Sequence, residues 1–193
     1  SIDLRRSDAC LDAGGDTVSG TFTFTYDGNS AAPADAGTYA VEATFTGSDP
    51  NYTDAVGNGS LTIEQATPTV SVSGGTFPYD GAPHPAAAEA TNANGDPVSG
   101  TIEITYDGDP VAPTDAGSYA VVATFTSSDP NYTGAIGNGA LAITPAIPTV
   151  TVTGGAHSYD GTSKHATAEA RDEGGDPVAG SFTFTYDGNV AAP

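Results

Sequence analysis

Apolar and polar residues alternate along several short stretches of this chain. In residues 118–126 the odd positions are apolar or aromatic, whereas most of the even positions are small or polar. The same pattern recurs in residues 70–73 and 101–106, each followed by a glycine-containing turn, and in residues 141–143, which come after the run Gly-Asn-Gly at 137–139. Successive side chains of a β-strand point to opposite faces, so a period of two predicts strands with one buried and one exposed face.

The pattern repeats every 80 residues. Residues 17–64 and 97–144 are identical at 32 of 48 aligned positions, without an insertion. Phe22 and Phe24 become Ile102 and Ile104, so the inward positions stay apolar while their neighbours change freely. Residues 85–90 have a helix-friendly composition, but the run is short, and we interpret it as a further strand. Tandem units of this kind more often serve reach and spacing than catalysis.

Six or seven short strands per repeat, separated by Gly, Pro and Asp turns, favour an all-β chain of antiparallel β-sandwiches in an elongated array. We expect three domains: residues 1–66, which are N-terminally incomplete, residues 67–146, which are complete, and residues 147–193, which are C-terminally truncated. The seams at residues 64–68 and 144–148 are short and contain proline, which is typical of semi-rigid spacers.

The charge is strongly negative, with 24 acidic residues against 4 basic ones and a net charge of −20. Nucleic-acid binding requires basic patches, and anionic membranes attract basic segments, so we expect no nucleic-acid partner and no direct insertion into a membrane. We interpret the acidity as a solvated surface that keeps repeats soluble and mutually repelled. Adaptation to high salt and loading with divalent cations are the alternatives.

The sharpest local signal is a pair of tyrosine-centred motifs. Residues 35–41 read Asp-Ala-Gly-Thr-Tyr-Ala-Val, and residues 115–121 read Asp-Ala-Gly-Ser-Tyr-Ala-Val. Both resemble the D-x-G-x-Y-x-C tyrosine corner of immunoglobulin-type (Ig-like) domains, with valine in place of the cysteine. The resemblance implies a structural role, in which the tyrosine hydroxyl bonds to the backbone, for Asp35, Gly37, Tyr39, Asp115, Gly117 and Tyr119.

A wider set of motifs points to one family. Pro-Thr-Val at 68–70, Tyr-Asp-Gly-Ala-Pro-His at 79–84, Ala-Pro-Thr-Asp-Ala-Gly at 112–117 and Ser-Asp-Pro-Asn-Tyr at 128–132 are similar to MBG-type and related bacterial Ig-like tandem repeats of large, adhesin-like surface proteins. The resemblance covers residues 13–193 and assigns no ligand. Residues 1–12, which contain the single cysteine, Cys10, do not fit it.

Three further features are candidate sites. Tyr-Asp-Gly occurs five times, and we interpret it as a strand end with a tight turn, the alternative being a sugar contact. The Asp-Pro-Asn-Tyr runs at 49–52 and 129–132 offer oxygen ligands; we expect turn caps there and no cofactor, with calcium as the alternative. His84 is replaced 80 residues later by Lys164, and no nucleophile motif accompanies either residue.

These observations predict a fragment of a bacterial extracellular or cell-surface protein that is not an enzyme. Its repeats would form a stalk or spacer that presents a distal functional region, with neighbouring repeats of the same chain as partners. The alternative is an adhesive module that contacts host glycan, mucin, matrix or another host surface protein through outward side chains.

Overall fold

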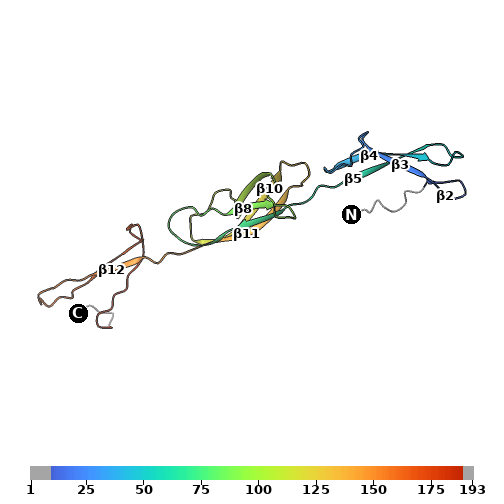
Figure 1. Ribbon diagram of the computed structural model, residues 1–193. Coiled ribbons are helices and arrows are strands. Elements are labelled where there is room, and N and C mark those ends of the chain that lie inside the picture. Colours follow the sequence, from blue (N-terminus) through green and yellow to red (C-terminus); the bar gives the residue numbers. More distant parts are fainter. Residues whose placement is uncertain (1–9, 189–193) are drawn as a thin grey trace. The chain divides into compact units, whose positions relative to one another are not determined.

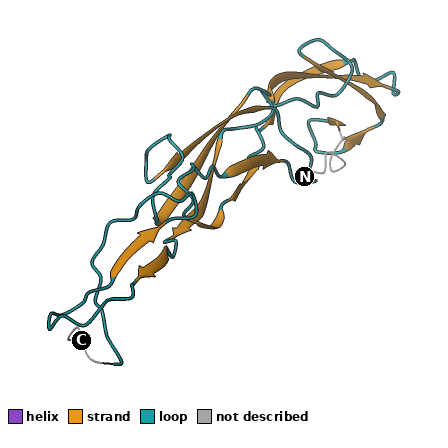
Figure 2. Cartoon of the chain, turned by 90° about the vertical axis from the view of Figure 1, so that its left-hand side faces the viewer, coloured by secondary structure: helices purple, strands orange, loops and turns teal. Residues whose placement is uncertain are grey.

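The computed structural model describes residues 10–188, and every regular element in this range is a β-strand (Figure 2). The described residues form two compact units. One unit comprises the residues up to Thr69 together with Ala90–Thr101 and Phe125–Ala135. The other comprises Val70–Glu89, Ile102–Thr124 and the described residues from Ile136 onward. The expectation of an all-β chain is confirmed.

The first repeat is built around a three-stranded antiparallel sheet. The strands of this repeat are β1 (Cys10–Leu11), β2 (Thr17–Val18), β3 (Gly20–Tyr26), β4 (Gly37–Gly47) and β5 (Ala55–Ile63). β1 pairs with β2, while β4 lies between β3 and β5. The strands β2, β3, β4 and β5 are labelled in Figure 1. The register places Phe22 opposite Phe45, with ring centroids 5.1 Å apart, and Tyr39 opposite Leu61. Apolar residues of the three strands therefore gather on one face.

The repeat pattern begins earlier in the structure than the sequence motifs indicate. β1 already pairs with β2, and Asp12 Oδ1 accepts hydrogen bonds from the backbone N–H groups of Gly14 and Asp16. Asn92, 80 residues later, accepts the same two bonds from residues 94 and 96. Residues 10–12 therefore follow the repeat, which corrects the expectation for that part of residues 1–12. Residues 1–9 lie outside the described residues.

The middle repeat contains two sheets. Its strands are β6 (Thr69–Ser73), β7 (Gly75–Pro78), β8 (Ala87–Thr91), β9 (Gly100–Tyr106), β10 (Gly117–Ser127) and β11 (Ala135–Thr144). One sheet has the order β7-β11-β10-β9, and the other pairs β6 with β8. The strand expected within residues 85–90 is β8. In the third repeat β12 (Thr149–Thr153) pairs antiparallel with β13 (Thr167–Arg171).

The pairing of β7 with β11 departs from the antiparallel arrangement expected from the sequence. β7 runs parallel to β11, with Leu141 opposite Gly75 and Thr144 opposite Pro78. The chain reaches this position by leaving β6 at Gly74, where a Cβ atom would lie 1.9 Å from the carbonyl oxygen of Ala140. Only glycine allows that approach, so the Gly74-Gly75 break moves the chain from one sheet to the other.

The core of the middle repeat is formed by both sheets. Tyr106, Val121, Leu141 and Ile143 are at most 5% exposed, and Val72 of β6 packs against them. Along β10 the alternation is as the sequence indicates, because Phe125 is 2% exposed while the adjacent Thr124 is exposed. The sandwich predicted from the period of two is therefore the architecture of this repeat.

Candidate functional site: the joint between repeats

Each tyrosine corner is closed by a hydrogen bond to the backbone. The Tyr39 hydroxyl donates to the carbonyl oxygen of Asp35 at 2.8 Å, and Tyr119 donates to Asp115 at the same distance. A Cβ atom at the intervening glycine would lie 3.3 Å from the hydroxyl at Gly37 and 3.1 Å from it at Gly117. The corner is thus the same tight local structure in both repeats, and it presents the backbone that precedes β4 and β10.

The Ser-Asp-Pro-Asn-Tyr loop between β10 and β11 is ordered first by local capping. Asp129 Oδ1 accepts the backbone N–H of Asn131 at 2.8 Å, and the Ser127 hydroxyl accepts the N–H of Asp129 at 3.1 Å. In the first repeat Asp49 likewise accepts the backbone N–H of Asn51. Both loops therefore contain the turn cap expected from the sequence.

The side chain of Asn131 binds the corner of the preceding repeat. Its Oδ1 atom accepts the backbone N–H of Ala36 at 2.7 Å, and its Nδ2 group donates to the Asp35 carboxylate at 3.3 Å. The Ala36 N–H can only donate and the carboxylate accepts, so this pair of partners fixes the orientation of the amide. The amide of Asn131 therefore bonds a backbone donor and a charged acceptor at the same time.

The backbone around Asn131 pairs with the linker that follows the first repeat. Ala66 donates its N–H to the carbonyl oxygen of Asn131 and accepts the N–H of Thr133, both at 2.9 Å. These two bonds form a parallel β-bridge between Ala66 and Tyr132. Main-chain pairing of this kind holds the loop and the linker in one register.

Two side chains of the linker add to this contact. The Gln65 amide donates to the carbonyl oxygen of Pro130 at 2.7 Å, and the hydroxyls of Thr67 and Thr133 lie 3.1 Å apart. Together with the four bonds above, they make six interactions between the loop at 129–133 and two segments of the first repeat and its linker, residues 35–36 and 65–67. Each intramolecular hydrogen bond contributes about 0.5–1.5 kcal/mol. We call this contact the joint.

The free copy of the same loop shows what the joint changes. Residues 51–53 of the first repeat are all exposed, whereas residues 131–133 are all half-buried. The Asn51 amide turns back and donates to Asp49 at 2.7 Å instead of reaching another repeat. The Tyr52 hydroxyl donates to Asp12, and this bond raises the pKa of Tyr52. Both loops could be identified from the sequence, but the contacts that Asn131, Ala36 and Gln65 make in the joint could not.

The five Tyr-Asp-Gly copies fall into two structural classes. At residues 26–28, 106–108 and 186–188 both the Asp and the Gly have positive φ, as a two-residue hairpin turn requires. In the first two of these copies the Asp carboxylate also accepts a backbone N–H, from Ala40 and Ala120 respectively. In the copies at 79–81 and 159–161 only the glycine has positive φ, so these two form loops of a different kind.

In the second class the Asp pairs with a residue four positions later. Asp80 Oδ1 accepts the N–H of Ala82 and lies 3.1 Å from His84 Nε2, and these two groups lower the pKa of Asp80. Asp160 accepts from the Lys164 ammonium and from Thr162, which lowers its pKa. His84 also stacks on Phe77, with ring centroids 4.7 Å apart. His84 and Lys164 thus occupy equivalent positions as partners of a loop carboxylate.

Residues 10–188 contain no cluster of three or more His, Cys, Asp or Glu side chains that could hold a metal ion. In the same range no helix is long and apolar enough to cross a membrane. Each carboxylate of the joint and of its free copy already accepts a protein donor: Asp35 and Asp129 bond to Asn131, and Asp49 bonds to Asn51.

The three successive repeats match one known family. The MBG domain matches residues 14–67, 68–147 and 148–193 in succession. The chain belongs to the MBG domain family. No curated protein matches the chain significantly. MBG repeats are typical of repeat-containing surface proteins.

Proposed function

We propose that this MBG array is a structural spacer of a bacterial extracellular or cell-surface protein and presents a distal functional region. The observation that carries the proposal is the joint, in which Asn131 binds both Ala36 and Asp35. A flexible tether needs no such contact, whereas a spacer gains from it because each hydrogen bond restricts bending between successive repeats. The acidic surface supports the same function by keeping neighbouring arrays apart in solution.

The stiffness of the joint is tested by measuring a distance across it. Spin labels are placed at the exposed positions Thr23 and Thr126 through cysteine substitutions, after Cys10→Ser removes the native thiol. Pulsed electron resonance should give a narrow distance distribution for the unaltered joint and a broad one after Asn131→Ala. Asn51→Ala is the matched control, since its amide bonds only within its own loop. A distribution that is equally broad with and without Asn131 would contradict the spacer function.

A second candidate function, adhesion, is favoured by two exposed tyrosines. Tyr159 is 98% exposed and Tyr79 is 41% exposed, and each precedes the paired carboxylate of its loop, Asp160 or Asp80. An exposed aromatic ring beside a hydrogen-bonding carboxylate is suited to stacking on a sugar and bonding its hydroxyls. Binding to an array of host-type glycans, lost on Tyr159→Ala and kept on Val178→Ala, would support adhesion. Equal binding by both variants would exclude this loop as the contact.

The proposed function involves no catalysis. His84 is the residue that most resembles an acid–base catalyst, and its ring lies between Phe77 and the carboxylate of Asp80. Its counterpart Lys164 is bound to Asp160 in the same way. Both side chains are accounted for as local partners of a loop, which supports a structural interpretation of this position.

A further inference from the structure

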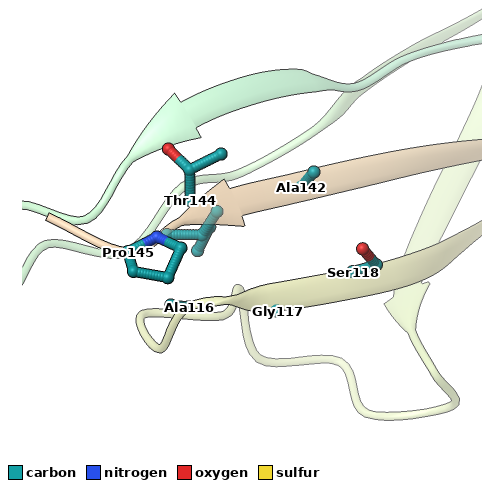
Figure 3. A pocket seen from close by; sticks show the side chains of 7 residues that line it. Ala116, Gly117, Ser118, Ala142, Thr144 and Pro145 are labelled. Atoms are coloured by element: carbon teal, nitrogen blue, oxygen red, sulfur yellow. The ribbon is translucent and has the colours of Figure 1, made fainter.

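A shallow cleft opens beside the tyrosine corner of the middle repeat. It has a volume of about 350 Å³ and lies between the start of β10 and the end of β11. Figure 3 shows Ala116 and Gly117 on one side of it and Thr144 and Pro145 on the other. Ala116, Ser118, Thr144 and Pro145 are all exposed.

This cleft is the repeat-related counterpart of the surface that receives Asn131. Ala116 stands 80 positions after Ala36, and Pro145 stands 80 positions after Gln65. The two corners contain the same hydrogen bond, in which the tyrosine hydroxyl donates to the aspartate carbonyl oxygen at 2.8 Å. The backbone N–H of Ala116 is therefore presented as that of Ala36 is.

The two corners differ in what covers them. Ala36 is half-buried beneath Asn131, whereas Ala116 is exposed. The counterpart of Asn131 for the second corner would fall after residue 193 of this sequence. The cleft therefore keeps the backbone N–H of Ala116 and the carboxylate of Asp115, but it lacks the loop that covers Ala36 in the first joint.

We propose that the cleft at Ala116 and Pro145 is a binding site for the Ser-Asp-Pro-Asn-Tyr loop of another MBG repeat placed in tandem. The asparagine amide of that loop accepts from the Ala116 N–H and donates to the Asp115 carboxylate. The backbone of Ala146 pairs with the loop as Ala66 pairs with residues 131–133. This inference rests on the proposed spacer function, and it identifies the loop of the following repeat as the binding partner of each tyrosine corner.

The second site differs from the first in two recognition groups. Gln65 becomes Pro145 and Thr67 becomes Ile147, so the two side-chain bonds of the first joint have no counterpart. Ile147 is 95% exposed. An apolar side chain of that size gains from leaving water, so we expect the incoming loop to cover Ile147. We therefore expect the second joint to keep the asparagine and backbone hydrogen bonds. Burial of the Ile147 side chain would replace the two side-chain hydrogen bonds of Gln65 and Thr67.

The test supplies the loop in tandem. A copy of residues 114–146 is appended after Pro193, the counterpart of Pro113, which keeps the 80-residue register. Amide hydrogen exchange at Ala116 is then compared with that at Ala36 in the same molecule. We expect exchange at Ala116 to slow at least about tenfold on extension, the effect of one added hydrogen bond of about 1.4 kcal/mol. Replacing the copied asparagine by alanine should abolish the slowing.

The proposal would be overturned if the extended chain folds and amide exchange at Ala116 is unchanged. It would also be overturned if exchange slows equally when alanine replaces the copied asparagine. A second measurement does not depend on folding of the extension. A cyclic peptide of residues 127–134 is titrated into the chain of 193 residues and followed by NMR at Ala116 and at the Ile147 methyls. We expect chemical-shift changes at Ala116 and Ile147 but none at Ala36, which Asn131 already covers. A peptide in which alanine replaces the asparagine should cause no changes. The absence of any change at millimolar concentrations of the original peptide would contradict the proposed site. Because spin-label distances probe only the first joint, failure of this inference and failure of the spacer function are distinguishable.

Discussion

Asn131 Oδ1 lies 2.7 Å from the backbone nitrogen of Ala36, which precedes it by 95 residues. The bond joins a loop of one repeat to the tyrosine corner of the repeat before it. Since the corner is a fixed local structure, the position of the loop is determined by the fold of the first repeat and not by the linker alone. The joint is therefore encoded within the repeat itself, in the Asp-Ala-Gly corner and the Asp-Pro-Asn loop.

Removing the Asn131 amide should destabilise the chain more than removing its counterpart. Asn131→Ala loses two hydrogen bonds and is expected to cost about 1–2 kcal/mol of unfolding free energy. Asn51→Ala loses only the bond to Asp49 in an exposed loop and should cost less than about 0.5 kcal/mol. Urea unfolding of both variants measures the difference. Equal costs would indicate that the contact with Ala36 contributes nothing to stability.

The facing of β10 predicts a second contrast. Phe125 is 2% exposed, and its ring lies so close to Gly100 that a Cβ there would be 2.4 Å from it. Phe125→Ala should therefore cost about 3–5 kcal/mol, whereas the exposed Thr124→Ala should stay within roughly 0.5 kcal/mol. Urea unfolding midpoints that shift equally for the two variants would show that the face assignment is wrong.

The two loop carboxylates should respond differently to loss of their partners. The Lys164 ammonium is the largest cause of the lowered pKa of Asp160, whereas the Ala82 N–H is the largest cause at Asp80. Lys164→Gln should thus raise the pKa of Asp160 toward 3.8, and His84→Gln should keep that part of the lowering at Asp80 that is due to the Ala82 N–H. Carboxyl NMR titrations measure both. A larger rise at Asp80 than at Asp160 would contradict this explanation.

These shifts also set the sign of a pH effect. Because the folded pKa of Asp160 lies below the unfolded value near 3.8, its ionisation contributes stability that is complete above that pH. The contribution is lost as the pH falls through the lowered folded pKa. Stability of the unaltered chain should accordingly fall below about pH 4 more steeply than that of Lys164→Gln. Thermal melts of the two chains between about pH 2 and about pH 5 check this, and parallel curves would contradict it.

Divalent cations should act on this chain by screening alone. Residues 10–188 contain no cluster of three or more His, Cys, Asp or Glu side chains that could hold a metal ion, and Asp129 and Asp35 each bond to Asn131. Calcium and magnesium at matched ionic strength are expected to raise the melting temperature equally. A rise specific to calcium at low concentration would instead favour the alternative of a metal-stiffened stalk.

Much of the fold could be predicted from the sequence because its causes are local. The period of two identifies β10 and places Phe125 inside and Thr124 outside. The Gly74-Gly75 pair likewise marks the end of β6, although the close approach of Ala140 that requires glycine at position 74 is a long-range contact. The parallel direction of β7 could not be predicted, since alternation describes the faces of a strand and says nothing about its neighbours.

The joint could be predicted only in part, because its contacts are not local. The Asp-Pro-Asn run indicates a capped turn, and Asp129 does cap it. The same letters occur at Asn51, where the amide binds its own loop, so the motif alone does not distinguish the two environments. The same limit applies to Tyr-Asp-Gly, since the copies at Asp80 and Asp107 have equal sequence and different backbone conformations. In each case the partner, and not the motif, determines the geometry.

The central claim is that the loop bearing Asn131 fixes the orientation of β3–β5 relative to residues 90–101 and 125–135, which belong to the same compact unit. Residual dipolar couplings measure this most directly, with β3–β5 compared with residues 90–101 and 125–135 in a single aligned sample. A single alignment tensor should fit both sets in the unaltered chain, and two tensors should be needed after Asn131→Ala. Two tensors of different magnitude in the unaltered chain would contradict the account.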